Sequence, residues 1–184
     1  DYFVITTNVD GQFRKAGFAA DRLFEVQGDY AYLQCAEACH DRLYYNEALV
    51  REMSRNTENC KIPSSLAPRC PVCGGAMEVN LRKDERFVED AGWHARAERY
   101  ERFLEERQNG RLVLLELGVG FNTPGIIRLP FERLAETTAA RLIRLNLKDA
   151  ALSEKIGDNG VGLALDAAAV LRRISHETNI GKFD

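Results

Sequence analysis

The chain has 184 residues, of which 45% are hydrophobic and 29% charged, which suits one globular domain with room for a small inserted module. The formal net charge of -3 disfavours a general attraction to nucleic acid or to acidic membrane surfaces. No segment approaches the roughly 18 consecutive apolar residues of a membrane span, and no basic-then-apolar leader opens the chain. We therefore expect a cytoplasmic protein without a membrane or nucleic-acid partner.

The first predicted element is a β-strand at residues 1–7, where aromatic and β-branched side chains dominate. A buried strand needs strands to pair with, so we expect native sequence before Asp1. Residues 8–11 form a polar break with turn chemistry, and a short helix after them ends at Gly17. Residues 23–26 predict a second, brief strand.

Two cysteine pairs, Cys35-x3-Cys39 and Cys70-x2-Cys73, have the spacing of zinc knuckles. The two glycines after Cys73 let backbone N–H groups face the sulfur atoms. Four thiolates complete a tetrahedral shell and leave no open position, so the predicted zinc ion is structural. The alternatives are thiols without a ligand, redox-active thiols, and a zinc ribbon that serves partner binding.

Other residues near these pairs are not expected to bind the metal. Cys60 lies outside both pairs and is interpreted as a small buried or loop thiol, and His40 is likewise left out of the ligand set. The polar residues 51–59 predict a loop between the two halves of the module. Two close cysteine pairs fit a reducing compartment better than a disulfide framework.

The second half of the chain alternates between helix and strand patterns. Apolar residues at helical spacing predict a helix at 95–107, and the apolar run 112–115 predicts a strand buried on both faces. A glycine-rich loop and a helical stretch interrupted by Pro130 come before a further strand at 141–146. A terminal helix begins near Ala167. This order is typical of βαβ units with a parallel sheet.

Several short motifs, taken in chain order, resemble the core of the sirtuin family of NAD-dependent enzymes. Residues 7–11 (Thr-Asn-Val-Asp-Gly), 16–17 (Ala-Gly) and 24–28 (Phe-Glu-Val-Gln-Gly) precede the two cysteine pairs. Sirtuins usually read Gln-Asn-Ile-Asp-Gly, Ala-Gly and Leu-His-Gly before a four-cysteine zinc module. Further on, residues 118–120 match their Gly-Thr-Ser turn and residues 145–146 their Ile-Asn pair.

The resemblance implies an α/β fold in which a four-cysteine zinc module is inserted into a partial, Rossmann-like parallel sheet. The NAD-binding domain would comprise residues 1–31 and 78–184, and the zinc module residues 32–77. Sirtuins begin with a glycine-rich strand-to-helix turn that binds the dinucleotide phosphates. No such segment precedes Asp10, so we expect the chain to be part of a longer enzyme and to bind NAD poorly alone.

Two departures from the common sirtuin pattern affect the expected chemistry. Gln27 stands at the position of the catalytic histidine, and Thr7 at that of the glutamine before the asparagine. This pattern, together with residues 80–82, 87–90 and 122–124, resembles the class M sirtuins, a microbial branch encoded beside macrodomain proteins. The resemblance implies ADP-ribosyl transfer to a lipoyl-carrying protein similar to the glycine-cleavage H protein, with a functionally linked macrodomain hydrolase.

Elementary chemistry supports the loss of deacylation. An imidazole, with a pKa of about 6.5, can take a proton from a ribose hydroxyl at neutral pH, as the deacylation mechanism requires. A glutamine amide only donates and accepts hydrogen bonds. Removing a positioned base costs roughly two to four orders of magnitude in rate. Transfer of ADP-ribose needs mainly positioning and stabilisation of the positive charge that develops on the ribose.

The resemblance assigns the following site residues. The catalytic residues are Asn8, Gln27 and Asp10. The NAD-binding residues are Thr7, Asn8, Asp10, Gln27, Gly118, Val119, Gly120, Asn146, Leu147 and Asp166. The zinc ligands are Cys35, Cys39, Cys70 and Cys73.

Some of these residues have an equally simple structural interpretation. Asp10 would form an Asx turn that caps the short helix, and Asn146 would be a turn residue at the end of a strand. Trp93 and His94 are tempting as an aromatic residue beside a base, but packing at the start of a helix explains them better. Arg82 and Asp84 would either line an acceptor channel or form a solvent-facing charge pair.

Two other functions stay open at this stage. One is an NAD-dependent lysine deacylase that uses a different base. The other is a non-catalytic, zinc-stabilised interaction module that retains only the NAD-binding fold.

Overall fold

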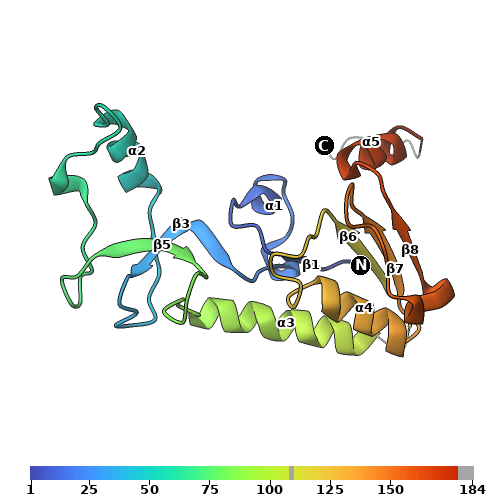
Figure 1. Ribbon diagram of the computed structural model, residues 1–184. Helices are drawn as coiled ribbons and strands as arrows, with labels where there is room; N and C mark the ends of the chain where they lie inside the picture. The colour runs from blue at the N-terminus through green and yellow to red at the C-terminus, as the bar shows by residue number, and fades with distance from the viewer. Residues whose placement is uncertain (108–109, 178–184) are drawn as a thin grey trace. The chain divides into compact units, whose positions relative to one another are not determined.

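The computed structural model describes residues 1–107 and 110–177 (Figure 1). The chain divides into two compact units, Asp1–Glu101 and Arg102–Asp184, which we call unit 1 and unit 2 and describe separately. Helix α3 (Ala91–Arg107) runs through the boundary between them. It begins four residues before the predicted position and ends where the sequence pattern predicts.

Unit 1 opens with two short parallel strands, β1 (Val4–Thr6) and β2 (Leu23–Glu25). The predicted short helix between them is α1 (Gln12–Lys15), followed by a 3-10 turn at Ala20–Arg22. The helix ends as predicted, because Gly17 adopts a φ of 85°, a left-handed conformation that favours glycine.

The core of unit 1 forms where β2 meets the start of α3. Leu23 and Phe24 are buried, and the ring of Phe24 lies 5.1 Å from that of Trp93 and 6.2 Å from that of Tyr100. Large aromatic side chains contribute much apolar surface to such a core, which helps a fold whose strands β1 and β2 are short.

An antiparallel sheet in the order β4-β3-β5 carries the cysteine module, as the left side of Figure 1 shows. Its strands are β3 (Gly28–Cys35), β4 (Tyr44–Tyr45) and β5 (Met77–Leu81). The segment between β4 and β5 contains α2 (Glu47–Arg55) and a 3-10 turn at Ser64–Leu66. The prediction of a loop over residues 51–59 is therefore wrong for residues 51–55, which belong to α2. An ion pair between Glu47 and Arg51, one helical turn apart, supports the helix there.

A buried pair of amide side chains connects this sheet to the segment that follows β5. The Oε1 atom of Gln34 accepts hydrogen bonds from Asn80 Nδ2 at 2.8 Å and from the backbone N–H of Val88 at 3.0 Å. Gln34 Nε2 donates to the carbonyl of Arg86 at 2.9 Å, and Asn80 Nδ2 also donates to the carbonyl of Val88 at 3.1 Å. These bonds fix residues 86–88 against β3 and β5.

Unit 2 contains a parallel sheet in the order β6-β7-β8, which confirms the predicted α/β class (Figure 1). Its elements are β6 (Val113–Leu117), α4 (Arg128–Thr137), β7 (Arg141–Leu145), a 3-10 segment at Glu154–Asn159, β8 (Gly160–Leu163) and α5 (Ala167–Glu177). Leu114, Leu142 and Phe131 are among the side chains of its core. The predicted strand at 141–146 and terminal helix from Ala167 agree with β7 and α5.

Two details of unit 2 differ from the predictions. Strand β6 is not buried on both faces, because Val113, Leu115 and Leu117 are exposed while Leu114 and Glu116 are buried. Pro130 does not interrupt its helix. It lies in the first turn of α4, where its missing N–H costs no intrahelical hydrogen bond.

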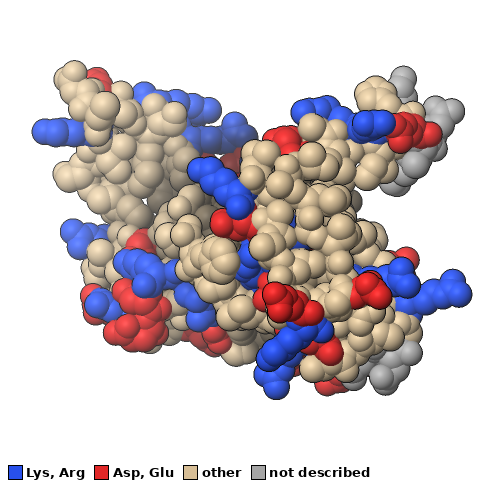
Figure 2. Space-filling model, turned by 45° about the vertical axis from the view of Figure 1, so that its right-hand side comes forward, with Lys and Arg blue, Asp and Glu red and all other residues tan. Residues whose placement is uncertain are grey.

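No described helix combines the length and the hydropathy that a membrane span requires. On the face drawn in Figure 2, Lys and Arg side chains are interspersed with Asp and Glu side chains. Mixed charge of this kind fits the small net charge of the chain.

Candidate metal centre and cofactor-binding loops

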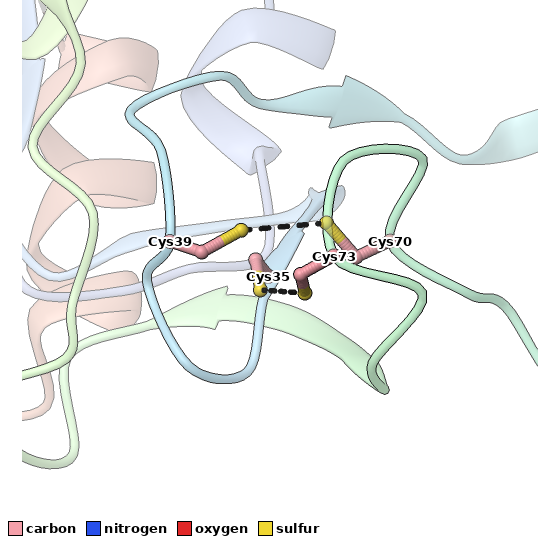
Figure 3. A group of neighbouring side chains, drawn as sticks. All are labelled: Cys35, Cys39, Cys70 and Cys73. Carbon is pink, nitrogen blue, oxygen red and sulfur yellow. Dashed lines mark hydrogen bonds between the residues drawn. The ribbon is translucent and has the colours of Figure 1, made fainter.

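The four predicted zinc ligands converge on one point in unit 1. Cys35 ends β3, Cys39 follows in the next loop, and Cys70 and Cys73 come from the turn before β5. Their sulfur atoms point toward one another (Figure 3), and all of them lie within 4.8 Å of each other. The Sγ–Sγ distances are 3.6 Å for Cys35 and Cys73 and 3.7 Å for Cys39 and Cys70.

These distances fit a tetrahedral zinc site. With Zn–S bonds of about 2.3 Å, the sulfur atoms of a regular tetrahedron lie about 3.8 Å apart. A disulfide would need about 2.05 Å instead. The donor set therefore suits a closed, structural Zn²⁺ site, in which Cys35, Cys39, Cys70 and Cys73 are the ligands.

Backbone and histidine donors favour the thiolate form of Cys70, whereas burial and the neighbouring thiols raise the pKa of Cys39. Hydrogen bonds from the backbone of Cys73 and Val72, with a smaller contribution from His40, lower the pKa of Cys70 to about 6. The Nε2 atom of His40 lies 3.3 Å from Cys70 Sγ, and the N–H of Gly75 donates to Cys73 Sγ at 3.4 Å. His40 thus acts beside the ligand set rather than in it, and this contact could not be read from the cysteine spacing.

The two segments predicted to hold the nicotinamide ribose lie side by side in unit 1. The N–H of Val26 donates to the carbonyl of Thr6 at 3.1 Å, and the N–H of Tyr30 donates to the carbonyl of Val9 at 3.0 Å. Asn8 belongs to the first segment and Gln27 to the second, between these two hydrogen bonds. The structure therefore brings together the backbone of the two amide residues on which the expected chemistry depends.

Asp10 forms the Asx turn that its structural interpretation predicts. Its Oδ1 atom accepts a hydrogen bond from the N–H of Gln12 at 3.0 Å, and Asp10 is exposed. Nearby, Thr7 is half-buried and Asn8 is exposed, while the N–H of Asn8 donates to Thr6 Oγ1 at 3.1 Å. The loop is held by its own backbone and short side chains, which leaves the Asn8 amide at the surface.

Gln27 sits in a two-residue turn that α3 and the end of β5 hold in place. The indole Nε1 of Trp93 donates to the carbonyl of Val26 at 3.0 Å, and the N–H of Arg82 donates to the carbonyl of Gln27 at 3.0 Å. Asp90 caps α3 by accepting a hydrogen bond from the N–H of Trp93 at 2.7 Å. Trp93 is thus a packing and hydrogen-bonding residue.

The charged residues after β5 are also engaged with one another. The guanidinium of Arg82 pairs with Glu89 and lies 4.3 Å from the ring centre of Phe87. His94 is largely exposed, with its Nε2 atom 3.8 Å from Glu89. Asp84 accepts a hydrogen bond from the N–H of Arg86 at 2.9 Å. The ion pair of Arg82 is therefore with Glu89 and not with Asp84.

Two buried carboxylates flank the turn that carries Gln27, and the sequence analysis missed them. Glu25 and Asp29 are each 7% exposed, and both pair with Arg14 of α1. The Nη2 atom of Arg14 lies 2.9 Å from Glu25 Oε2. The feature of the sequence that could have revealed these buried carboxylates is their position, two residues before and two residues after Gln27, within an otherwise apolar stretch.

In unit 2, the predicted cofactor-binding residues of two loops meet at the carboxyl ends of β6 and β7. The N–H of Gly118 donates to the carbonyl of Leu145 at 2.9 Å, and Asn146 Nδ2 donates to the carbonyl of Val119 at 3.0 Å. Asn146 Oδ1 accepts hydrogen bonds from the N–H groups of Lys148 and Asp149, both at 3.0 Å. Gly118 adopts a φ of 65°, which favours glycine at this turn.

The side chain of Asn146 therefore organises the loops, as its structural interpretation predicts. Leu147 is exposed in the same loop. Asp166 is exposed and caps α5, since its Oδ1 atom accepts a hydrogen bond from the N–H of Ala169 at 2.7 Å. Parallel sheets bind ligands at this carboxyl edge, so the position of both loops suits a nucleotide.

A buried ionic cluster beneath these loops was also missed. Arg144 is fully buried and pairs with Glu116 through Nε–Oε1 and Nη2–Oε2 distances of 2.6 and 3.0 Å. Its Nη1 atom donates to Glu132 at 2.7 Å and to the carbonyl of Ala151 at 2.6 Å. Burial alone would lower the pKa of Arg144, but the hydrogen bonds with Glu116 and Glu132 raise it. Arg128, the second buried arginine, joins this cluster with Nη1 at 3.7 Å from Glu116 Oε1.

No family model matches the chain. A protein ADP-ribosyltransferase of Staphylococcus aureus is 36% identical over 172 residues, which are 92% of this chain and 55% of the relative. A solved structure from work on the mechanism and regulation of Sir2 enzymes has a TM-score of 0.55, with 21% identity, and covers 96% of this chain and 61% of its own. The chain therefore has the fold of Sir2 enzymes, and its sequence is similar to that of a protein ADP-ribosyltransferase.

Two further relatives are named for different activities. A Fusarium oxysporum protein named "Probable bifunctional ADP-ribose hydrolase/ADP-ribosyltransferase" is 36% identical over 80% of this chain and 26% of the relative. An NAD-dependent protein deacylase 2 of Pseudomonas aeruginosa is 26% identical over 89% of this chain and 56% of the relative. The chain spans about half the length of the first of these curated relatives, the Staphylococcus aureus protein.

Proposed function

We propose that the protein containing this chain is an NAD-dependent mono-ADP-ribosyltransferase of the sirtuin type. The observation that carries the proposal is Gln27, which stands in a rigid turn beside the Asn8 segment, where the deacylating sirtuins have a histidine. The similarity to a protein ADP-ribosyltransferase over 92% of this chain supports the same activity.

The reaction needs little from the protein beyond positioning. The glycosidic bond of NAD breaks, nicotinamide leaves with the bonding electrons, and an acceptor atom forms a bond to the ribose carbon and loses its proton to solvent. Asn8 would hold the nicotinamide ribose with Gln27 opposite, each through amide hydrogen bonds. Because Gln27 cannot take a proton from a ribose hydroxyl, deacylation would lack its general base.

The buried ion pairs around Gln27 fit a site that positions NAD but has no general base. Glu25 and Asp29 are both bound by Arg14, whose single positive charge offsets one of their two negative charges. The positively charged ribose of the transition state would therefore rely on nearby amide dipoles and on the net negative charge of this pair. Two carboxylates against one guanidinium give that cluster an excess of one negative charge.

We further propose the acceptor and the partner. The acceptor would be a lipoyl-carrying protein similar to the glycine-cleavage H protein, and a macrodomain hydrolase would remove the modification. A relative whose name joins an ADP-ribose hydrolase to an ADP-ribosyltransferase supports the link to a hydrolase.

A transfer assay tests the activity. The full-length protein, as its organism encodes it, is incubated with NAD labelled in the adenosine moiety and with the lipoylated carrier. Label on the carrier, removed by a macrodomain hydrolase, is the expected result. Absence of label with every lipoylated or unlipoylated carrier would contradict the proposal.

The second candidate function is NAD-dependent deacylation, because a deacylase matches 89% of this chain. The same reaction, run with an acyl-lysine peptide in place of the carrier, distinguishes the two. Release of nicotinamide that depends on the peptide, with loss of its acyl group, would favour deacylation over transfer.

A further inference from the structure

Arg128 makes an unusual set of contacts for a buried arginine. Its side chain is 4% exposed, yet its guanidinium binds mainly backbone rather than a carboxylate. Nη1 donates to the carbonyl of Val119 at 3.2 Å, and Nη2 donates to the carbonyls of Asp149 and Ala151 at 3.0 and 3.2 Å. One side chain at the start of α4 thus joins the loop after β6 to the loop after β7.

Asn146 and Arg144 donate further hydrogen bonds to two of the same carbonyl groups. The carbonyl of Val119 also accepts from Asn146 Nδ2 at 3.0 Å, and that of Ala151 also accepts from Arg144 Nη1 at 2.6 Å. The ring centre of Phe121 lies 4.2 Å from the guanidinium carbon of Arg128. Both loops are therefore fixed from beneath by side chains of the buried cluster.

Fixing these carbonyls also fixes the direction of three N–H groups. In a trans peptide unit, the C=O of one residue and the N–H of the next point in opposite directions. Because the carbonyls of Val119, Asp149 and Ala151 point toward the arginines, the following N–H groups point away from them. These N–H groups, of Gly120, Ala150 and Leu152, have no acceptor among the described residues.

The surroundings suit a ligand that carries oxygen acceptors. Ala150 and Leu152 line a shallow pocket of about 430 Å³ in unit 2. Gly162 also lines that pocket, and a Cβ atom there would come within 1.9 Å of the carbonyl oxygen of Ala150, so any larger residue would displace the loop. Free backbone N–H groups at the carboxyl edge of a parallel sheet are donors for ribose and phosphate oxygens.

We propose that Arg128 is a positioning residue for the adenosine half of NAD. It holds the two loops so that the N–H groups of Gly120, Ala150 and Leu152 face the ribose hydroxyl and phosphate oxygens. Since the loops are ordered before the ligand arrives, the ligand does not bear the cost of ordering them. This inference rests on the proposed function, because it takes NAD as the ligand.

The substitution Arg128→Gln tests the inference in the full-length protein. Glutamine is shorter and reaches one carbonyl at most, whereas Glu116 keeps its bidentate partner Arg144. We expect the Kd for ADP-ribose, measured by calorimetry, to rise about tenfold or more through lost preorganisation. The matched control is Arg133→Gln, an exposed arginine on the same helix, which should leave the Kd unchanged.

Kinetics separate positioning from a loss of folded protein. A positioning role raises the KM for NAD and leaves kcat at saturating NAD within about twofold, whereas partial unfolding lowers kcat at constant KM. Arg128→Lys keeps the buried charge and one hydrogen bond. Its KM for NAD should therefore lie between those of the unsubstituted protein and of Arg128→Gln. A KM unchanged in both Arg128 variants would overturn the inference.

The calorimetric titration also distinguishes failure of the inference from failure of the proposed function. If the unsubstituted full-length protein binds neither ADP-ribose nor NAD, the proposed function is wrong. If it binds both and Arg128→Gln binds them equally well, the function stands and the role of Arg128 is wrong.

Discussion

Glu116 and Arg144 are direct neighbours in the register of β6 and β7 and form a bidentate ion pair in which neither side chain is exposed. Desolvating both charges is expensive, so the pair contributes little net stability compared with apolar residues of the same shape. Its effect is on specificity: a shift of one residue in the strand register would leave both charges buried without a partner. The pair therefore fixes the register of the strands whose ends carry the loops predicted to bind the cofactor.

Removing one charge of this pair should be strongly destabilising. Glu116→Gln leaves Arg144 with only Glu132 as a charged partner, and we expect the free energy of unfolding to fall by about 3–5 kcal/mol. Urea denaturation followed by circular dichroism measures the change. Glu136→Gln, an exposed residue on α4, is the control and should shift the midpoint little.

The zinc site gives a second prediction. Cys70→Ser should lower the zinc content below one ion per chain and reduce the melting temperature, because a structural zinc site contributes on the order of 10 kcal/mol to local folding. Mass spectrometry of the native protein measures the metal content. Cys60→Ser, which alters an exposed thiol outside the ligand set, should retain the ion. Stoichiometric zinc in Cys70→Ser would show that the ligand set is wrong.

The buried amide pair offers a test of local order. Gln34→Leu removes the acceptor for Val88 N–H and the donor to the Arg86 carbonyl, so the free energy of unfolding should fall by about 2–4 kcal/mol. Hydrogen exchange should show faster exchange at residues 86–88 than in the unsubstituted protein. The double substitution with Asn80→Leu should cost less than the sum of the single changes, because neither amide is then left without its partner.

The glycine after Gln27 should not tolerate a side chain. Gly28 has a φ of 102°, and a Cβ atom there would lie 2.2 Å from the carbonyl oxygen of Asn80. We expect Gly28→Ala to separate β3 from β5 locally and to lower transfer activity at least tenfold through the displaced turn. The control is Gly125→Ala, where a Cβ atom meets nothing within 4 Å. Equal activity in both variants would argue against a rigid Gln27 turn.

Asn8 provides the most direct test of the proposed chemistry. Its side chain is exposed, so Asn8→Ala should leave the melting temperature and zinc content unchanged. Transfer activity should fall on the order of 100-fold, as is typical when an amide that stabilises a transition state is removed. A variant with normal turnover would remove Asn8 from the site.

The cysteine module shows what a sequence predicts well. The convergence of the four cysteines was predicted from their spacing, because tetrahedral coordination constrains the residue type, number and local turn so strongly. The parallel strands of unit 2 were likewise predicted, since an apolar run followed by a glycine loop leaves few alternatives. Helix α2 was missed, because the mostly polar residues 51–55 resemble a loop until the pairing of Glu47 with Arg51 is considered.

The buried ionic residues show what local reasoning misses. Glu116 and Arg144 look like ordinary solvent-facing residues in half-exposed strands, and only their pairing across two strands buries them. The role of Arg128 is harder still to predict, because its partners are backbone carbonyls, which have no signature in the sequence. The feature of the sequence that could have indicated the Glu116–Arg144 pair was a charged residue within each of two consecutive, otherwise mostly apolar strands.

The cysteine module also bears on how well this chain would tolerate an insertion. Residues 54–65 are all exposed, and the segment that contains them begins and ends at cysteines of the candidate metal site. Doubling the length of a flexible loop costs only about 0.6 kcal/mol in closure entropy, far less than the metal supplies. An epitope or a reporter peptide inserted between Asn56 and Ser65 would thus be held at both ends by the cysteine site, and strands β2 and β3, which flank Gln27, would keep their positions.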